Sequence, residues 1–189
     1  MKIINSRNTK LNLYSVFHKL FVLLILTSLM SCATSLSEYK SSQPSLMMDS
    51  FFNGKLTAWG TFQDRNGKVL RRFQVDMIGT WDGNNGILDE DFVYDDGEKQ
   101  KRIWRITKNP DGTFTGTADD VVGEAIGRSE GFALNWRYTM SLPVDDKVYE
   151  VQFDDWMYLV NAKNVINRAS VSKFGLHVGE VTLFIQKHP

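Results

Sequence analysis

"FFNGKLTAWGTFQDRNGKVLRRFQVDMIGTW" (residues 51–81) alternates apolar and polar side chains on both sides of Asn66 and Gly67. Asn and Gly best tolerate the positive φ angles of a two-residue type I′ turn, so we expect a β-hairpin here. That turn pairs Phe62 with Arg71, Gly60 with Phe73, Ala58 with Val75, Leu56 with Met77 and Phe52 with Trp81. One face of the hairpin then becomes nearly all apolar. Because a one-residue slip would mix the two faces, the pattern predicts this register.

Two further turns predict hairpins in "GILDEDFVYDDGEKQKRIWRITK" (residues 86–108) and in the segment after it. We expect three-residue loops at residues 95–97 and 110–112, each with a Gly that supplies the left-handed position. The resulting pairs are Glu90 with Arg102, Leu88 with Trp104 and Ile106 with Gly116. A carboxylate and a guanidinium are therefore predicted to lie opposite each other on an apolar face.

Short alternating segments separated by Gly, Asn, Asp and Pro continue to the end of the chain. They predict about eight to ten antiparallel strands and no long helix, which is typical of an all-β domain. A meander of adjacent hairpins closes most naturally into an up-and-down β-barrel, because closure removes the exposed sheet edges. The interior of such a barrel can hold one small ligand.

The longest apolar run, in "LFVLLILTSLMSC" (residues 20–32), comes before this domain. It is too short for the ~20 residues that span a bilayer, and it follows basic residues without any acidic residue. Residues 1–31 are therefore predicted to be a cleaved signal peptide. The sequence Leu29-Met30-Ser31-Cys32 resembles the bacterial lipobox, in which the Cys thiol is acylated. The alternative is an ordinary signal peptide followed by a chance Cys.

Acylation of Cys32 predicts a membrane anchor, since two or more acyl chains give stable attachment. Residue 33 is Ala and not the Asp that retains many lipoproteins at the inner membrane, so the outer membrane, facing the periplasm, is expected. We expect residues 32–48, which are rich in Ser, to form the acylated N-terminus and a flexible tether. Residues 49–189 then form the β-barrel domain.

Removal of residues 1–31 changes the charge of the protein. The whole chain has 22 basic and 22 acidic residues, and the removed segment contains four basic residues and no acidic one. The mature chain, with 18 basic residues against 22 acidic ones, has a net charge of about −4. We therefore expect no nucleic-acid partner, because proteins that bind nucleic acids neutralise phosphates with Lys and Arg.

Long motifs of the domain resemble a known family. The segments "GTWDGNNGILDEDFVYDDGEKQ", "ALNWRYTMSLPV" and "VQFDDWMYLV", with the first hairpin, are similar to the bacterial lipoproteins grouped as the domain-of-unknown-function family numbered 3833. The resemblance covers residues 51–187. It implies an exported lipoprotein with a lipocalin-like, calycin-type β-barrel and no established activity. It supplies no catalytic residues.

Residues of the usual catalytic and metal sites are scarce. After the signal peptide only His177 and His188 remain, and a nucleophilic relay needs a His between a hydroxyl and a carboxylate. The acidic loop at residues 82–90 misses the spacing of a calcium-binding EF-hand, and a turn rich in Asn, Asp and Gly is the simpler interpretation. We therefore expect no metal, no cofactor and no recognisable catalytic centre.

Charged side chains are predicted on the inner face of the barrel. Strand alternation places Arg71, Glu90, Arg102 and Asp155 inward, where a buried charge is costly unless it is paired. Three hypotheses remain: a buried polar network, with Asp155 paired to Arg71 or Arg102; an acid/base couple of Glu90 and Asp155; and a binding site. In the last, Trp81 and Trp104 would line a cavity for an amphipathic anion such as a fatty acid, held by the guanidinium groups.

A structural or interaction protein is the competing class. In that case Trp side chains would fill the barrel, and outward aromatic residues such as Trp59 and Trp136 would form an exposed patch for an unknown protein partner. An enzyme is the least supported class. The volume of the cavity separates the first two classes, since a ligand needs an empty lumen.

Overall fold

The structure is a computed structural model that describes residues 15–19, 34–144 and 147–189. It contains two compact units, residues 1–35 and 36–189. In the first unit, residues 15–19 are helical. Cys32 and residues 20–31 lie outside the described residues, so the signal peptide and the acylation site remain predictions. No helix among the described residues is both long and apolar enough to cross a membrane.

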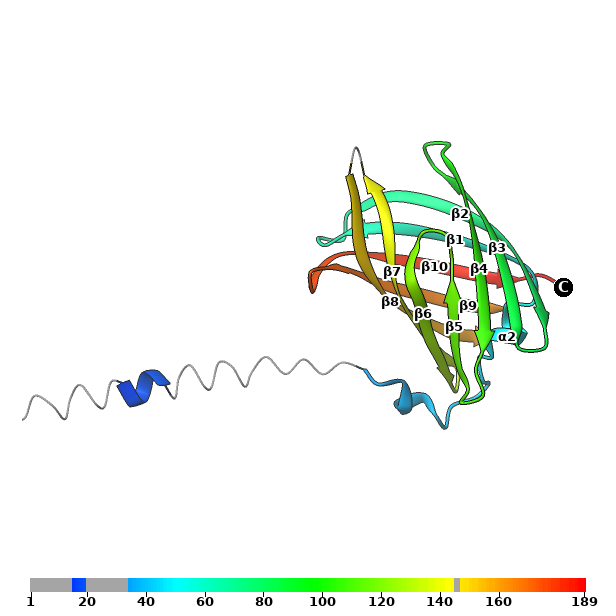
Figure 1. Cartoon of the computed structure of the whole chain (residues 1–189), viewed down its shortest axis with the longest axis horizontal. Coiled ribbons are helices and arrows are strands. Elements are labelled where there is room, and N and C mark those ends of the chain that lie inside the picture. Colours follow the sequence, from blue (N-terminus) through cyan, green and yellow to red (C-terminus); the bar gives the residue numbers. More distant parts are fainter. Residues whose placement is uncertain (1–14, 20–33, 145–146) are drawn as a thin grey trace, which may run out of the picture. The chain divides into compact units, whose positions relative to one another are not determined.

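Ten antiparallel strands form the second unit and close into a barrel (Figure 1). Each strand pairs with its neighbours in the chain, and the first strand pairs with the last. The all-β, up-and-down barrel predicted from the sequence is therefore confirmed. The strands are β1 (Gly54–Asp64), β2 (Val69–Asp82), β3 (Asn85–Tyr94), β4 (Lys99–Lys108), β5 (Thr113–Thr117), β6 (Val121–Glu130), β7 (Ala133–Val144), β8 (Lys147–Asn161), β9 (Asn164–Lys173) and β10 (Leu176–Lys187).

The predicted strand registers are confirmed through most of the first three hairpins. Glu90 pairs with Arg102, and Ile106 pairs with Gly116. In the first hairpin the pairs from Phe62 and Arg71 back to Leu56 and Met77 are present.

The turn of that first hairpin differs from the prediction. Asp64 bonds to Lys68 around a three-residue loop in which Gly67 has the positive φ angle of 83°. The carboxylate of Asp64 also accepts hydrogen bonds from the backbone of Asn66 and Lys68. A β-bulge between Phe62 and Gln63 then restores the expected register. The two-residue type I′ turn was therefore wrong, although the register beyond it was right.

The segment before β1 packs against the barrel, so the flexible tether expected up to residue 48 is wrong from Tyr39 onward. A 3-10 helix, η1 (Leu36–Tyr39), places the ring of Tyr39 5.0 Å from that of Phe132. The backbone of Leu46 donates to Gly131, and the Leu46 side chain is fully buried. The composition of residues 32–48 did not reveal these contacts, because the segment is rich in Ser and only a few apolar residues, such as Leu46, attach it to the barrel.

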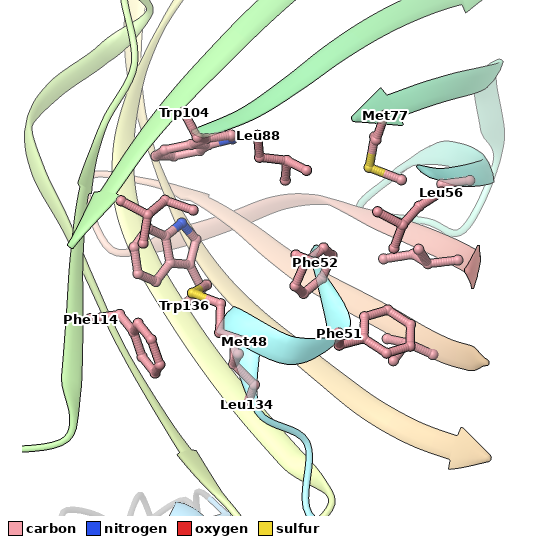
Figure 2. Packing of buried hydrophobic residues seen from close by; sticks show 14 of the residues in the cluster. Met48, Phe51, Phe52, Leu56, Met77, Leu88, Trp104, Phe114, Leu134 and Trp136 are labelled. Carbon is pink, nitrogen blue, oxygen red and sulfur yellow. The ribbon is translucent and has the colours of Figure 1, made fainter. Parts of the chain in front are cut away.

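A short helix, α2 (Met48–Phe51), enters one end of the barrel (Figure 2). Met48 lies beside Trp136 and Leu134, and Phe52 follows the helix into the core. The sequence pattern placed Phe52 in the first strand, opposite Trp81, whereas β1 begins only at Gly54. The carbonyl of Phe52 nevertheless accepts a hydrogen bond of 3.2 Å from the Trp81 indole. Helix α2 closes this end of the barrel with apolar side chains, and Met48 and Phe52 contribute to the lining of the cavity inside.

Candidate functional site

A cavity of about 380 Å³ lies within the barrel. Its floor is apolar and includes Met48 and Phe52 from the α2 region, together with Trp104 and Trp136. Its wall also contains charged and polar side chains, each placed inward by the period-two alternation of a strand. These side chains are Arg71, Glu90, Tyr94, Gln100, Arg102, Tyr138, Asp155 and Asn167. The volume is within the range of small-molecule sites.

Arg102 is the central cation of the cavity. Its guanidinium donates from Nε and Nη2 to the carboxylate of Asp120, with the shortest bond 2.7 Å long. Asp120 precedes β6, in a turn whose orientation the sequence did not reveal. Burial lowers the pKa of Arg102, but the bonds to Asp120 and the charge of Glu90 raise it above its ordinary value. Arg102 therefore stays charged, and its main partner is Asp120.

Glu90 is held only weakly by Arg102. The two residues are paired across β3 and β4, yet the nearest nitrogen of Arg102 lies 3.7 Å from Oε2 of Glu90. This buried oxygen accepts no hydrogen bond within the described structure. Burial raises the pKa of Glu90 to about 7, although the charge of Arg102 opposes the shift. A hydrogen bond from the Trp104 side chain also opposes the shift, so Glu90 is a buried carboxyl whose remaining hydrogen-bonding capacity is at Oε2.

Asp155 lies on the opposite wall and has a different partner from the ones expected. Its carboxylate accepts a hydrogen bond from Nδ2 of Asn167, and none of the described arginines forms an ion pair with it. Burial raises the pKa of Asp155 to about 7, although the bond from Asn167 lowers it. The predicted pairing with Arg71 or Arg102 was wrong because both arginines bind other carboxylates. Asn167, which the sequence interpretation missed, is buried and its Oδ1 accepts no hydrogen bond.

Arg71 lies near the hairpin turns, at the other end of the cavity from α2. Its guanidinium lies 3.7 Å from the centre of the Tyr94 ring and bonds to Asp96 and Glu98, both at 2.9 Å. Both predicted inward guanidinium groups are therefore neutralised by the protein's own carboxylates. The lumen does not have the cationic end that the sequence interpretation expected.

Aromatic side chains also line the cavity and contact one another. Tyr138 stacks on Phe153 with ring centres 4.9 Å apart and meets Trp104 edge to face. Burial raises the pKa of Tyr138 well above its ordinary value, and the charge of Asp155 adds to the shift. Of the two predicted Trp residues, Trp104 lines the cavity, whereas Trp81 packs in the core beside Phe114.

The outer surface carries the remaining candidates. Trp59 is exposed and stacks on Phe184, beside a shallow hollow on the outside of the barrel. Trp136, expected to face outward, is instead buried against Gly116 and Gly127, whose missing side chains make room for its ring. His177 contacts only the hydroxyl of Ser170 among the described hydrogen bonds. In the described part of the chain, no three His, Cys, Asp or Glu side chains group as metal ligands would.

Comparison with solved structures finds the same fold elsewhere. The S-type phycobiliprotein lyase CPES from Guillardia theta superposes with a TM-score of 0.55 at 7% sequence identity. The match covers 83% of this chain and 99% of that one. At this identity the likeness concerns the fold alone, a lipocalin-like barrel. No curated protein matches the sequence.

The sequence itself matches a family described as "Protein of unknown function (DUF3833)" over residues 26–187. The match spans nearly the whole chain, including all ten strands and the residues that line the cavity. The resemblance noted in the sequence motifs is therefore confirmed, and the chain belongs to the DUF3833 family.

Proposed function

We propose that the protein is a membrane-anchored lipoprotein of the bacterial envelope whose barrel binds a lipid-like, hydrophobic or amphipathic molecule. The observation that carries this proposal is the cavity of about 380 Å³ inside the barrel. Its floor is lined with aromatic and aliphatic side chains, which favour the burial of an apolar chain. A barrel completely filled by Trp side chains, as the competing interpretation requires, would have no such space.

The anchor is proposed from the sequence. The lipobox-like Leu29-Met30-Ser31-Cys32 and the Ala at position 33 favour acylation at Cys32 and attachment at the outer membrane, with the domain in the periplasm. A protein held there has access to lipids of both the membrane and the periplasm. We propose binding as the function of the cavity, since most of the residues that line its described wall are apolar.

Extraction of the protein from its native host tests the proposal. Mass spectrometry should detect a co-purifying hydrophobic molecule, and the neutral dye N-phenyl-1-naphthylamine should bind to the emptied barrel with increased fluorescence. Ala169→Phe places a bulky ring into the lumen and should abolish dye binding. Ile166→Phe, on the outer face of the same strand, is the matched control and should bind the dye normally.

Circular dichroism of both variants is the control for folding, and both should give the spectrum of the wild type. Absence of any bound molecule, together with equal dye binding by the two variants, would reject the lumen as the site. In that outcome the exposed pair Trp59 and Phe184 and the hollow beside them become the candidate contact surface for a protein partner.

A further inference from the structure

Buried hydrogen-bond acceptors line both walls of the cavity. Glu90 comes from β3, whereas Asp155 and Asn167 come from β8 and β9. In the closed order of ten strands, β3 and β8 are five places apart in either direction, so these acceptors face the lumen from opposite sides. Burial is the main cause of the raised pKa of Glu90, and the charge of Asp155 adds a smaller contribution in the same direction.

Two of these acceptors lack donors. Oε2 of Glu90 and Oδ1 of Asn167 are buried and accept no hydrogen bond within the described structure. The amide nitrogen of Asn167 is already engaged by Asp155 and by the carbonyl of Trp156, so the amide orientation that leaves Oδ1 unpaired is fixed by its neighbours. Buried polar groups in proteins nearly always have partners. Acceptors that the protein itself leaves unpaired on a cavity wall indicate a donor supplied from outside.

The charge of the cluster indicates the nature of that donor. Of the two cations that line the cavity, Arg102 gives its best hydrogen bonds to Asp120, and Arg71 pairs with Asp96 and Glu98 near the hairpin turns, with its Nε left unpaired there. A carboxylate bound between Glu90 and Asp155 would add another negative charge beside these two carboxyls and would leave the two acceptors unpaired. An ammonium group would donate to both acceptors and reduce the excess of negative charge.

We propose that Glu90, Asp155 and Asn167 form a head-group subsite and that the ligand of the barrel is an apolar chain that ends in an ammonium group. This inference rests on the proposed function and specifies the ligand class of the same cavity. The apolar chain lies against the floor near Met48 and Phe52, and the ammonium group donates to Oε2 of Glu90 and Oδ1 of Asn167. Asp155 fixes the Asn167 amide and supplies the second negative charge.

Chain-matched probes test the head group. Dodecylammonium, dodecanol and dodecanoate are titrated, below their micelle concentrations, against the barrel loaded with N-phenyl-1-naphthylamine at about pH 8, where both carboxyls are largely ionised. Dodecylammonium should displace the dye at least about tenfold more effectively than dodecanoate, with dodecanol between them. Equal or tighter binding of dodecanol or dodecanoate overturns the inference while the proposed function stands. Displacement by none of the three rejects the proposed function itself.

Variants then locate the preference. Glu90→Gln keeps the shape of the side chain and removes its charge, so dodecylammonium should bind about tenfold more weakly while dodecanol binding changes by less than about twofold. Glu124→Gln makes the same change of charge at an exposed position on β6 and should leave all three probes unaffected. Asp155→Asn is the second test if Glu90→Gln does not fold. An unchanged preference for dodecylammonium in a folded Glu90→Gln or Asp155→Asn protein contradicts the assignment.

Discussion

The Glu90 carboxyl links the stability of the barrel to pH. Its pKa is about 7 in the folded protein and about 4.5 in the unfolded chain, so the folded state binds the proton more tightly. A raised carboxyl pKa gives a stability contribution that is complete below pH 4.5 and is lost as the pH rises through 7. Over that interval Glu90 should lower the free energy of unfolding by about 3 kcal/mol.

Urea denaturation at several pH values checks this expectation. Glu90→Gln should be relatively more stable than the wild type at neutral pH and should lose much of the decline between pH 4.5 and 7. The exposed replacement Glu124→Gln should leave the pH dependence of the wild type intact. Parallel curves for the wild type and Glu90→Gln would show that burial does not shift this carboxyl.

Arg102 should contribute more to stability than Arg105, the other arginine of β4. Arg102→Met leaves the buried Glu90 and the partly buried Asp120 without their cation, and loss of one partner of a buried pair typically costs about 3–5 kcal/mol. Arg105→Met is the matched control, because Arg105 points outward and lies 3.7 Å from the fully exposed Asp119. Its loss should cost less than about 1 kcal/mol in the same denaturation experiment. Similar costs for the two variants would contradict the central role of Arg102.

At the scale of elements, the contact of α2 with the wall of the barrel depends on Gly79 of β2. A Cβ atom added there would lie 1.8 Å from the carbonyl oxygen of Phe52, and this is a backbone atom that has no rotamer to change. Gly79→Ala should therefore displace the α2 region and lower the free energy of unfolding by about 3 kcal/mol, at the upper end of overpacking effects. Thr80→Ala, at the neighbouring exposed position, should have little effect. Thermal unfolding of the two variants measures the difference, and equal midpoints would refute this packing role.

Hairpins were the elements that the sequence predicted best, because turn chemistry and strand alternation are local. The pairing of Glu90 with Arg102 follows directly from the loop that ends in Gly97. The bulge at Phe62 and Gln63 was missed because two different turns give the same register once the extra residue is absorbed. Helix α2 was missed because its four residues carry no helical periodicity, and only the space within the barrel gives them a place.

The candidate site could be predicted only in part from the sequence, for a related reason. Strand alternation placed Arg71, Glu90, Arg102 and Asp155 on the inner face, but it does not say which charges meet across a barrel. The partner of Arg102 is Asp120, which precedes β6 in a turn, and the partner of Asp155 is Asn167 on the next strand. Neither contact joins directly opposed residues, since Asp155 is paired with Ala169 and Asp120 lies in a turn, so the register alone did not reveal them. The inferred change from an anionic to a cationic head group follows from these contacts together with the unpaired acceptors of Glu90 and Asn167.

For the whole molecule, the proposed position of the barrel in the cell depends on one residue outside the described part of the chain. Cys32 is the only cysteine in the sequence, and it ends the lipobox-like segment Leu29-Met30-Ser31-Cys32. Since the barrel holds its fold by packing and hydrogen bonds, loss of this thiol should leave the domain folded and remove only the acyl anchor. The proposed access to lipids at the outer membrane would be lost with it.

Fractionation of cells that express Cys32→Ser tests the anchor. The variant should leave the membrane fraction as soluble protein or accumulate as an unprocessed precursor, whereas the wild type should remain with the outer membrane and carry acyl chains on its N-terminal peptide by mass spectrometry. Ser35→Ala, a matched small change three residues further on, should behave as the wild type. The soluble Cys32→Ser protein should still bind N-phenyl-1-naphthylamine, because the cavity lies entirely within residues 48–185. Retention of processed Cys32→Ser in the outer membrane would show that another part of the protein holds it there, and the exposed aromatic pair Trp59 and Phe184 would then be the first surface to mutate.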